Sequence, residues 1–162
     1  NKRIFIKNDL EKIVVFINEN TQYGDVAVLV SGDPGFYSML PYLKNKLSDK
    51  DIQIEVIPGI SSMQMAFCRA GMPWQKADVF SLHGREESDW INRVRVSEAA
   101  GMLTDKKNTP AVIAQKILEA GINDRKVIVC ENLSYPEERI VRGELKDILD
   151  MNFSDSVIIV YR

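Results

Sequence analysis

The chain of 162 residues is poor in histidine and cysteine, and this excludes several kinds of site. His83 is the only histidine, so catalytic triads and zinc centres built on several imidazoles are excluded, and we expect no metal site. The two cysteines, Cys68 and Cys130, lie in apolar surroundings without a paired spacing. Such cysteines favour a reducing, cytoplasmic location over a disulfide-framed secreted protein.

The sequence also lacks long apolar runs and an excess of either charge. No run reaches the roughly 18 apolar residues that a membrane span requires, so we expect no membrane contact. The formal net charge is −2, with 21 Lys and Arg against 23 Asp and Glu, which gives no general attraction for nucleic acid. Neither the G-x-G-x-x-G nor the G-x-x-x-x-G-K fingerprint occurs, so dinucleotide and triphosphate cradles lose support.

What the first half contains is an alternation of helix-like and strand-like patterns. Apolar spacing predicts helices over 9–20, over 37–47, and from 61 or 62 to 70. Unbroken apolar runs at 26–30 and 52–57 are typical of strands buried on both faces. This α-β-α-β-α order favours parallel strands with right-handed crossovers.

The second half continues the pattern. Thr109 as N-cap, Pro110 at the first helical position and Gly121 beyond the end define a helix over 109–120. The remaining patterns predict strands over 78–83, 99–103, 126–130 and 157–161, and helices within 86–98 and over 144–149.

We therefore expect an α/β protein of two small lobes with mostly parallel sheets. The N-terminal lobe spans 1–85, a connecting helix or linker spans 86–98, and the C-terminal lobe spans 99–162. Ligands of open α/β sheets bind beyond the carboxyl ends of strands, and a cleft between lobes is the usual place for one.

Several strand-end loops have two readings each. Gly32 and Gly35 around Asp33 form either a turn with a helix-capping carboxylate or a backbone that approaches a ligand. Ser61 and Ser62 either cap the next helix or present hydroxyl and N–H groups to a carboxylate. Polar loops also follow the strands predicted at 78–83, 99–103 and 126–130.

Five segments, in order along the chain, resemble motifs of the tetrapyrrole (corrin/porphyrin) methylase family. They are Val-Ser-Gly-Asp-Pro-Gly-Phe-Tyr (30–37), Glu-Val-Ile-Pro-Gly-Ile-Ser-Ser (55–62), Ser-Leu-His-Gly-Arg (81–85), Leu-Thr-Asp with Asn-Thr-Pro-Ala (103–111), and Glu-Asn-Leu-Ser-Tyr-Pro-Glu-Glu-Arg-Ile (131–140). The third and fifth are most similar to the subgroup that methylates C5 of cobalt-precorrin-7 or precorrin-6Y in cobalamin biosynthesis. The family opens with a strand and a Gly-rich loop, which is the part of the tetrapyrrole methylase fold that we expect to be missing here.

The resemblance implies binding of S-adenosylmethionine as methyl donor. It places Gly32, Asp33, Pro34 and Gly35 near the methionine part and Ser61 and Ser62 at its carboxylate or amine. It places Leu103, Asn132 and Leu133 around the adenine, largely through backbone groups. Positioning of the donor against an electron-rich ring carbon supplies most of the acceleration, so a sequence with one histidine suits this reaction.

For the tetrapyrrole, the resemblance implies contacts between basic residues and ring carboxylates. The candidates are Arg85, Lys106, Lys107 and Arg139, each of which is otherwise an ordinary solvated charge. His83 either orients the ring or accepts the proton lost after methylation. The family further implies a homodimer or other homo-oligomer, and a separate partner is a candidate for the C15 methylation and decarboxylation.

Other functions stay open at this point. The chain is alternatively another tetrapyrrole methylase, a methyltransferase like diphthine synthase, or a non-catalytic ligand-binding fragment. A Rossmann nucleotide-binding module is disfavoured, because its fingerprint does not occur.

Overall fold

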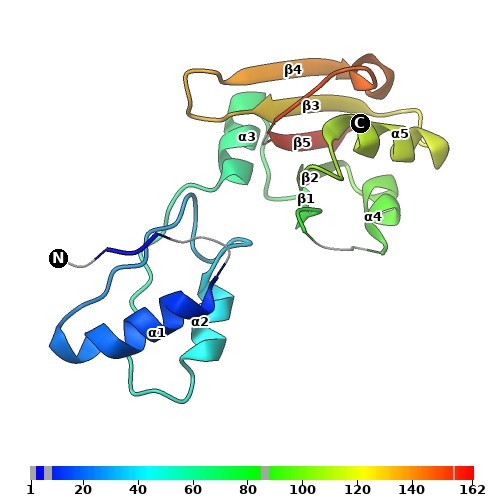
Figure 1. Cartoon of the computed structure of the whole chain (residues 1–162). Coiled ribbons are helices and arrows are strands. Elements are labelled where there is room, and N and C mark those ends of the chain that lie inside the picture. The colour runs from blue at the N-terminus through cyan, green and yellow to red at the C-terminus, as the bar shows by residue number, and fades with distance from the viewer. Residues whose placement is uncertain (1–2, 6–8, 85–87, 155) are drawn as a thin grey trace. The chain divides into compact units, whose positions relative to one another are not determined.

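The computed structural model describes residues 3–5, 9–84, 88–154 and 156–162 (Figure 1). The chain divides into two compact units, Asn1–Ser61 and Ser62–Arg162. No helix in the described ranges is long and apolar enough to cross a membrane.

The first unit is built on two helices. It contains α1 (Glu11–Asn20), the short 3-10 helix η1 (Thr21–Tyr23) and α2 (Leu40–Lys46). Ile13 and Ile17 of α1 pack with Leu43 of α2 and with Leu47, and this small core holds the unit together. The helix predicted over 37–47 begins only at Leu40, because Tyr37 has a φ of 50°, in the left-handed region that an α-helix does not use.

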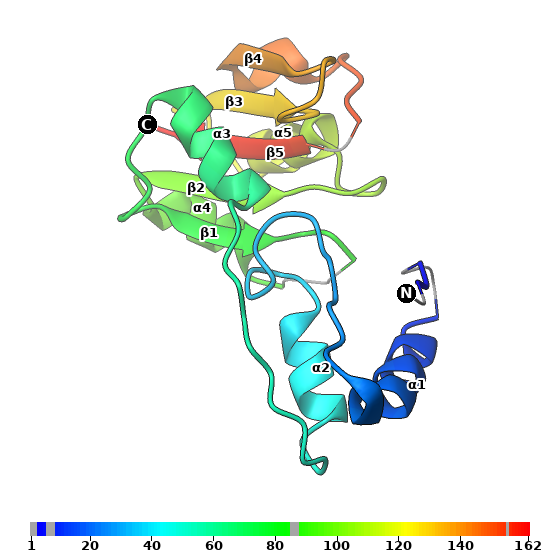
Figure 2. The same ribbon diagram turned by 90° about the vertical axis from the view of Figure 1, so that its left-hand side faces the viewer.

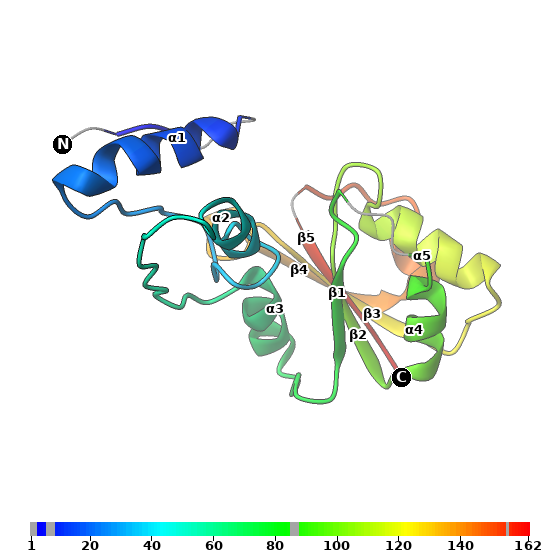
Figure 3. The ribbon, with the colours of Figure 1, turned by 90° about the horizontal axis from the view of Figure 1, so that it is seen from below.

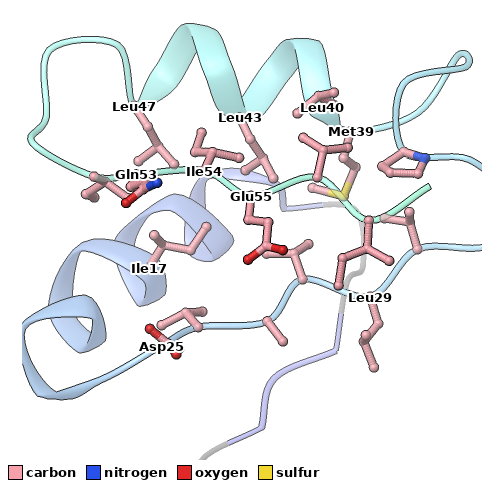
Figure 4. Close-up of a pocket in the computed structure, with 18 of the residues that line it drawn as sticks. Ile17, Asp25, Leu29, Met39, Leu40, Leu43, Leu47, Gln53, Ile54 and Glu55 are labelled. Carbon is pink, nitrogen blue, oxygen red and sulfur yellow. The ribbon is translucent and has the colours of Figure 1, made fainter.

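The two strands predicted in this unit are not present as such. Residues 26–30 and 52–57 belong to no sheet among the described residues. A strand is defined by a hydrogen-bonded neighbour about 4.8 Å away. Here the two segments instead line one groove, which Figure 4 shows with Asp25 and Leu29 on one side and Gln53 and Glu55 on the other.

The second unit is a sheet with helices on both faces. Its elements are α3 (Ser62–Ala70), β1 (Asp78–Ser81), α4 (Trp90–Val96), β2 (Ala99–Leu103), α5 (Pro110–Glu119), β3 (Lys126–Glu131), β4 (Arg139–Glu144), the 3-10 helix η2 (Leu145–Ile148) and β5 (Ser156–Tyr161). The described strands form one five-stranded sheet in the order β1-β2-β5-β3-β4. Figure 3 shows α3 on one face and α4 and α5 on the other.

The expectation of mostly parallel strands does not hold for this sheet. Only β1 and β2 pair in parallel, and the other three pairings are antiparallel. β4 is not among the predicted strands. Residues 132–138 connect it to β3, and a connection this short joins antiparallel neighbours only. β4 is an edge strand in which three of six residues are exposed and three are charged, so its apolar pattern is weak.

The segment 86–98 also has a different place from the one expected. We predicted that it connects two lobes, but β1 and β2 on either side of it are neighbours in one sheet. Its helix α4 is therefore the crossover of a β-α-β element inside the second unit. Arg93 of α4 holds it there, because its guanidinium bonds the carboxylate of Asp78 and lies 4.1 Å from the ring centre of Phe80.

Close packing of α3 on the sheet depends on Gly101 in β2. A Cβ atom at this position would lie 2.6 Å from Sδ of Met63 and 2.7 Å from the ring of Phe67. All three residues are buried. Only glycine lets α3 approach the strand this closely. Figure 2 shows α3 in front of the sheet.

The N-cap of α5 gives a test of this fold. The predicted cap is confirmed, since Thr109 Oγ1 accepts a hydrogen bond from the backbone N–H of Val112 at 3.3 Å. Thr109→Ala removes this acceptor and is expected to lower the free energy of unfolding by about 1 kcal/mol. Thr109→Ser keeps it and should cost much less. Chemical denaturation of both variants measures the difference, and equal losses would contradict the capping role.

Candidate functional site

The loops after β1, β2 and β3 lie on the same side of the sheet, at the carboxyl ends of these strands, and this side is called the sheet edge below. Leu103 at the end of β2 and Cys130 near the end of β3 both pair with Val157 of β5, from opposite sides. Ser81 at the end of β1 pairs with Leu103. This register places the second unit's candidate residues along a single edge, as expected of a site at strand carboxyl ends.

The hydrogen bond of His83 in the loop after β1 defines which ring nitrogen carries the proton. Nδ1 of this ring lies 2.9 Å from the carbonyl oxygen of Thr104. A carbonyl only accepts, so Nδ1 carries the proton of the neutral ring and Nε2 is left as an acceptor. The side chain is exposed, so Nε2 is open to a ligand.

Asp105 ties the loop after β1 to the loop after β2. Its carboxylate accepts backbone N–H bonds from Gly84 at 2.8 Å, Lys107 at 2.8 Å and Asn108 at 2.6 Å. The hydrogen bonds from the backbone of Asn108 and Gly84 hold the pKa of Asp105 below its ordinary value. Asn108 Nδ2 in turn donates to the carbonyl of Leu82 at 3.0 Å.

Sequence reasoning assigned no role to Asp105 or Asn108. The signal for them was present, because an Asp whose side chain bonds the N–H groups two and three residues later is a common turn device. The same loop leaves Lys106 and Lys107 exposed beside a half-buried Leu103. Both lysines are therefore available to an anionic ligand.

A buried carboxylate organises the loop after β3. Glu131 is 7% exposed and accepts from Arg139 Nε at 2.6 Å, from Ser154 Oγ at 2.9 Å and from the backbone N–H of Ser154. Ser154 Oγ also lies 2.9 Å from Oδ1 of Asn132. Burial raises the pKa of Glu131, but the bonds from Ser154 and Arg139 outweigh it and hold the pKa below its ordinary value.

This support shapes the backbone around Leu133. Asn132 and Ser134 both have positive φ, at 50° and 69°, which L-residues rarely adopt. The backbone N–H of Ser134 is held by Glu138 at 2.8 Å. Leu133 is half-buried between them, where it offers apolar surface and main-chain groups at the sheet edge.

Arg139 has partners within the protein. Besides Glu131, its guanidinium donates to the carbonyl of Asn152 at 2.7 Å and lies 4.9 Å from the ring centre of Phe153. It therefore serves first to fix the loop, and its predicted contact with a substrate carboxylate stays a prediction. Arg85, the other predicted arginine, lies outside the described residues.

The first unit places its predicted residues in two touching loops. Asp33 Oδ1 accepts the N–H of Gly35 at 2.8 Å, and Oδ2 accepts the N–H of Gly59 at 3.3 Å. A Cβ on Gly59 would lie 2.4 Å from the carbonyl oxygen of Gly32, so this contact requires glycine. Pro34 contributes a carbonyl that accepts from Leu40 at 3.1 Å. Asp33 therefore bridges the loops.

Ser61 and Ser62 lie where the two units join in sequence. Ser61 is 5% exposed and Ser62, the first residue of α3, is exposed. The structure thus gathers one set of predicted residues in the first unit's loops and another at the sheet edge of the second. That both sets bind one ligand stays a prediction.

The sequence model of the family of tetrapyrrole (corrin/porphyrin) methylases matches residues 3–149 of this chain. The chain belongs to this family. It is 35% identical over 147 residues to a probable cobalt-precorrin-7 C(5)-methyltransferase of Methanocaldococcus jannaschii, covering 89% of this chain and 68% of that protein. It is 30% identical over 139 residues to the cobalt-precorrin-7 C(5)-methyltransferase of Salmonella typhimurium, covering 86% and 67%.

Solved structures agree on the fold. A uroporphyrin-III C-methyltransferase from Thermus thermophilus, in complex with S-adenosylhomocysteine, matches with a TM-score of 0.78 at 19% identity and covers 98% of this chain and 76% of that one. Family membership makes this chain an S-adenosylmethionine-dependent methyltransferase. The predicted α/β class and the tetrapyrrole methylase fold are confirmed, although the sheet is mostly antiparallel.

The Glu131 cluster gives a test of the site's support. Glu131→Gln leaves Arg139 without its anion and is expected to cost about 1–3 kcal/mol of unfolding free energy at neutral pH. The native carboxylate has a lowered pKa, so its contribution is present above the ordinary glutamate pKa and is lost as the pH falls through the lowered native one. The two proteins should therefore converge in acid.

Denaturation between neutral pH and acid measures this convergence. Glu137→Gln, which changes an exposed neighbour in the same loop, is the matched control and should leave stability within about 0.5 kcal/mol. A constant difference between Glu131→Gln and the parent at every pH would contradict the ionic role of Glu131.

Proposed function

We propose that this chain transfers a methyl group from S-adenosylmethionine to C5 of cobalt-precorrin-7, or of the related precorrin-6Y, in cobalamin biosynthesis. The two curated relatives named above carry this activity in their names. The identity to these relatives over most of the chain carries the proposal. It is supported by the register of β1, β2, β5 and β3, which brings the loops with an exposed histidine, two exposed lysines and an apolar turn to one side of the sheet.

The residues present suit the methyl donor. Leu103 ends β2 and Leu133 follows β3, and both side chains are half-buried. The turn around Leu133, with positive φ on either side, presents main-chain groups beside this apolar surface. An adenosine group combines an apolar ring with polar edges and suits such a surface. In the first unit, the Gly32–Gly35 loop supports backbone approach to the methionine part, and Ser61 and Ser62 supply hydroxyl groups.

When bound, S-adenosylmethionine supplies a methyl group on a sulfonium, which departs as a neutral thioether. The protein's contribution is then positioning more than acid or base strength. We assign the lysines Lys106 and Lys107, with Arg85 and Arg139, to carboxylates of the tetrapyrrole. His83 Nε2 is assigned to the proton that the ring carbon loses after methylation, or to orienting the ring.

The assembly and location remain proposals of the same kind. A homodimer, a cytoplasmic location and a separate partner for the C15 step all accord with this pathway. Sedimentation of the purified chain tests the first of these directly.

The decisive experiment is incubation of the chain with labelled S-adenosylmethionine and cobalt-precorrin-7. The product is expected to gain one methyl group, which NMR places at C5. A methyl group at another ring position would assign the chain to another tetrapyrrole methylase. Donor binding by calorimetry without any transfer would support a ligand-binding fragment instead.

His83 is tested by His83→Ala. If Nε2 accepts the proton, kcat should fall by about 10²–10⁴-fold, the range for a positioned general base, while the Kd of S-adenosylmethionine stays unchanged. Gln115→Ala, on the exposed face of α5, serves as the control. Unchanged turnover in His83→Ala would remove this role.

The lysines are tested by Lys106→Glu and Lys107→Glu. Each is expected to raise the KM for the tetrapyrrole several-fold, and more at low ionic strength, because salt screens exposed charges. The KM for S-adenosylmethionine should not move. Lys116→Glu, an exposed charge reversal on α5, is the matched control. An equal effect of all three changes would show a general charge effect and no specific contact.

A further inference from the structure

One carboxylate of the second unit is bonded to both loops that carry the candidate substrate contacts. Asp105 directly precedes Lys106 and Lys107 in the loop after β2. It also bonds Gly84, the residue that follows His83 in the loop after β1. The proposed methyl transfer gives Asp105 no role of its own, although its place joins the two sets of residues that the transfer uses.

The two oxygens of Asp105 have separate partners. Oδ1 accepts the backbone N–H groups of Lys107 at 2.8 Å and Asn108 at 2.6 Å, which closes the turn within its own loop. Oδ2 accepts the backbone N–H of Gly84 at 2.8 Å, across a separation of 21 residues in the chain. The local turn needs only the first oxygen, so the second is free to join the two loops.

Both neighbours of His83 in the chain are bonded to the loop after β2. On one side, the carbonyl of Leu82 accepts from Asn108 Nδ2 at 3.0 Å. On the other side, the N–H of Gly84 donates to Asp105. The backbone that carries the imidazole is therefore held before and after the histidine.

The acceptor of the imidazole proton is fixed as well. The carbonyl of Thr104, 2.9 Å from Nδ1 of His83, belongs to a residue that is 7% exposed. Thr104 Oγ1 donates to the carbonyl of Ser156 at 2.8 Å, and its backbone N–H donates to the same carbonyl at 3.3 Å. Because this acceptor is anchored to β5, the bond to Nδ1 depends on where the backbone of His83 lies.

The bond to Gly84 restrains a joint that is otherwise easily moved. Gly84 has a φ of 63° and is exposed, and glycine has the widest choice of backbone conformations. The N–H groups of Asn108 and Gly84 hold the pKa of Asp105 below its ordinary value, so its carboxylate is charged at neutral pH. A bond to a charged acceptor is about twice as strong as a neutral one, which suits a restraint in contact with water.

We propose that Asp105 is a positioning residue of the methyl transfer, which acts through His83. Its bond to Gly84 fixes the backbone that carries the imidazole, so that Nδ1 donates to the carbonyl of Thr104 and Nε2 stays an acceptor. The catalytic consequence rests on the proposed function of His83, whereas the placing of the ring does not.

NMR of the 162-residue chain tests the placing of the ring directly. His83 is the only histidine, so long-range 1H–15N correlations of the neutral imidazole need no assignment. The parent should show the proton on Nδ1. Asp105→Asn keeps an oxygen for the turn but turns its amide toward Gly84, so a mixture with the Nε2–H form is expected. Asp150→Asn, which changes an exposed carboxylate outside these loops, should keep the Nδ1–H form.

A double-mutant cycle tests whether Asp105 acts through His83. Asp105→Asn should lower kcat by about 10–100-fold, the cost of a displaced catalytic group, with an unchanged Kd for S-adenosylmethionine. In the His83→Ala background, the same change should alter kcat by less than about twofold, because no imidazole is left to position. A purely structural role would lower kcat equally in both backgrounds.

Two results would overturn the proposal. The first is an Nδ1–H tautomer that is unchanged in Asp105→Asn and also in Asn108→Ala, which loosens the other neighbour of His83 without touching the carboxylate. The second is equal loss of kcat from Asp105→Asn with and without His83. Circular dichroism checks that each variant is folded. If the parent transfers no methyl group, the proposed function falls, and the tautomer still shows whether Asp105 holds the ring.

Discussion

The position of β5 between β2 and β3 is the constraint on which the second unit depends. β5 runs against both neighbours, so β2 and β3 point the same way although they do not touch. Val157 pairs with Leu103 on one side and Cys130 on the other, which brings the loops after β2 and β3 to one level. A shift of β5 by one residue would move each of its side chains to the opposite face and offset these loops.

Three carboxylates then fix the loops by the same means. Asp33, Asp105 and Glu131 each accept backbone N–H groups from a segment distant or adjacent in sequence. A carboxylate offers several lone pairs, so one side chain can hold two loops at once. The loops that contain the candidate site residues are consequently held by charge-assisted hydrogen bonds.

Local patterns predicted the elements of the second unit well. The helix at 109–120 with its Thr109 cap and the strand at 99–103 were readable because each depends on neighbours within a few residues. β4 was not predicted, because an edge strand with few buried positions has a weak pattern of apolar residues. The runs at 26–30 and 52–57 have the composition of buried strands but no strand beside them, and composition does not reveal a missing neighbour.

The sequence by itself determined the family and most of the helices and strands after Ser62, with β4 as the exception. Short motifs and periodicity encode these features locally. Only the tertiary structure decided the antiparallel sheet order, the protonated Nδ1 of His83 and the engagement of Arg139 by Glu131. Each of these depends on which distant groups the fold brings within hydrogen-bond reach, and no local pattern specifies that.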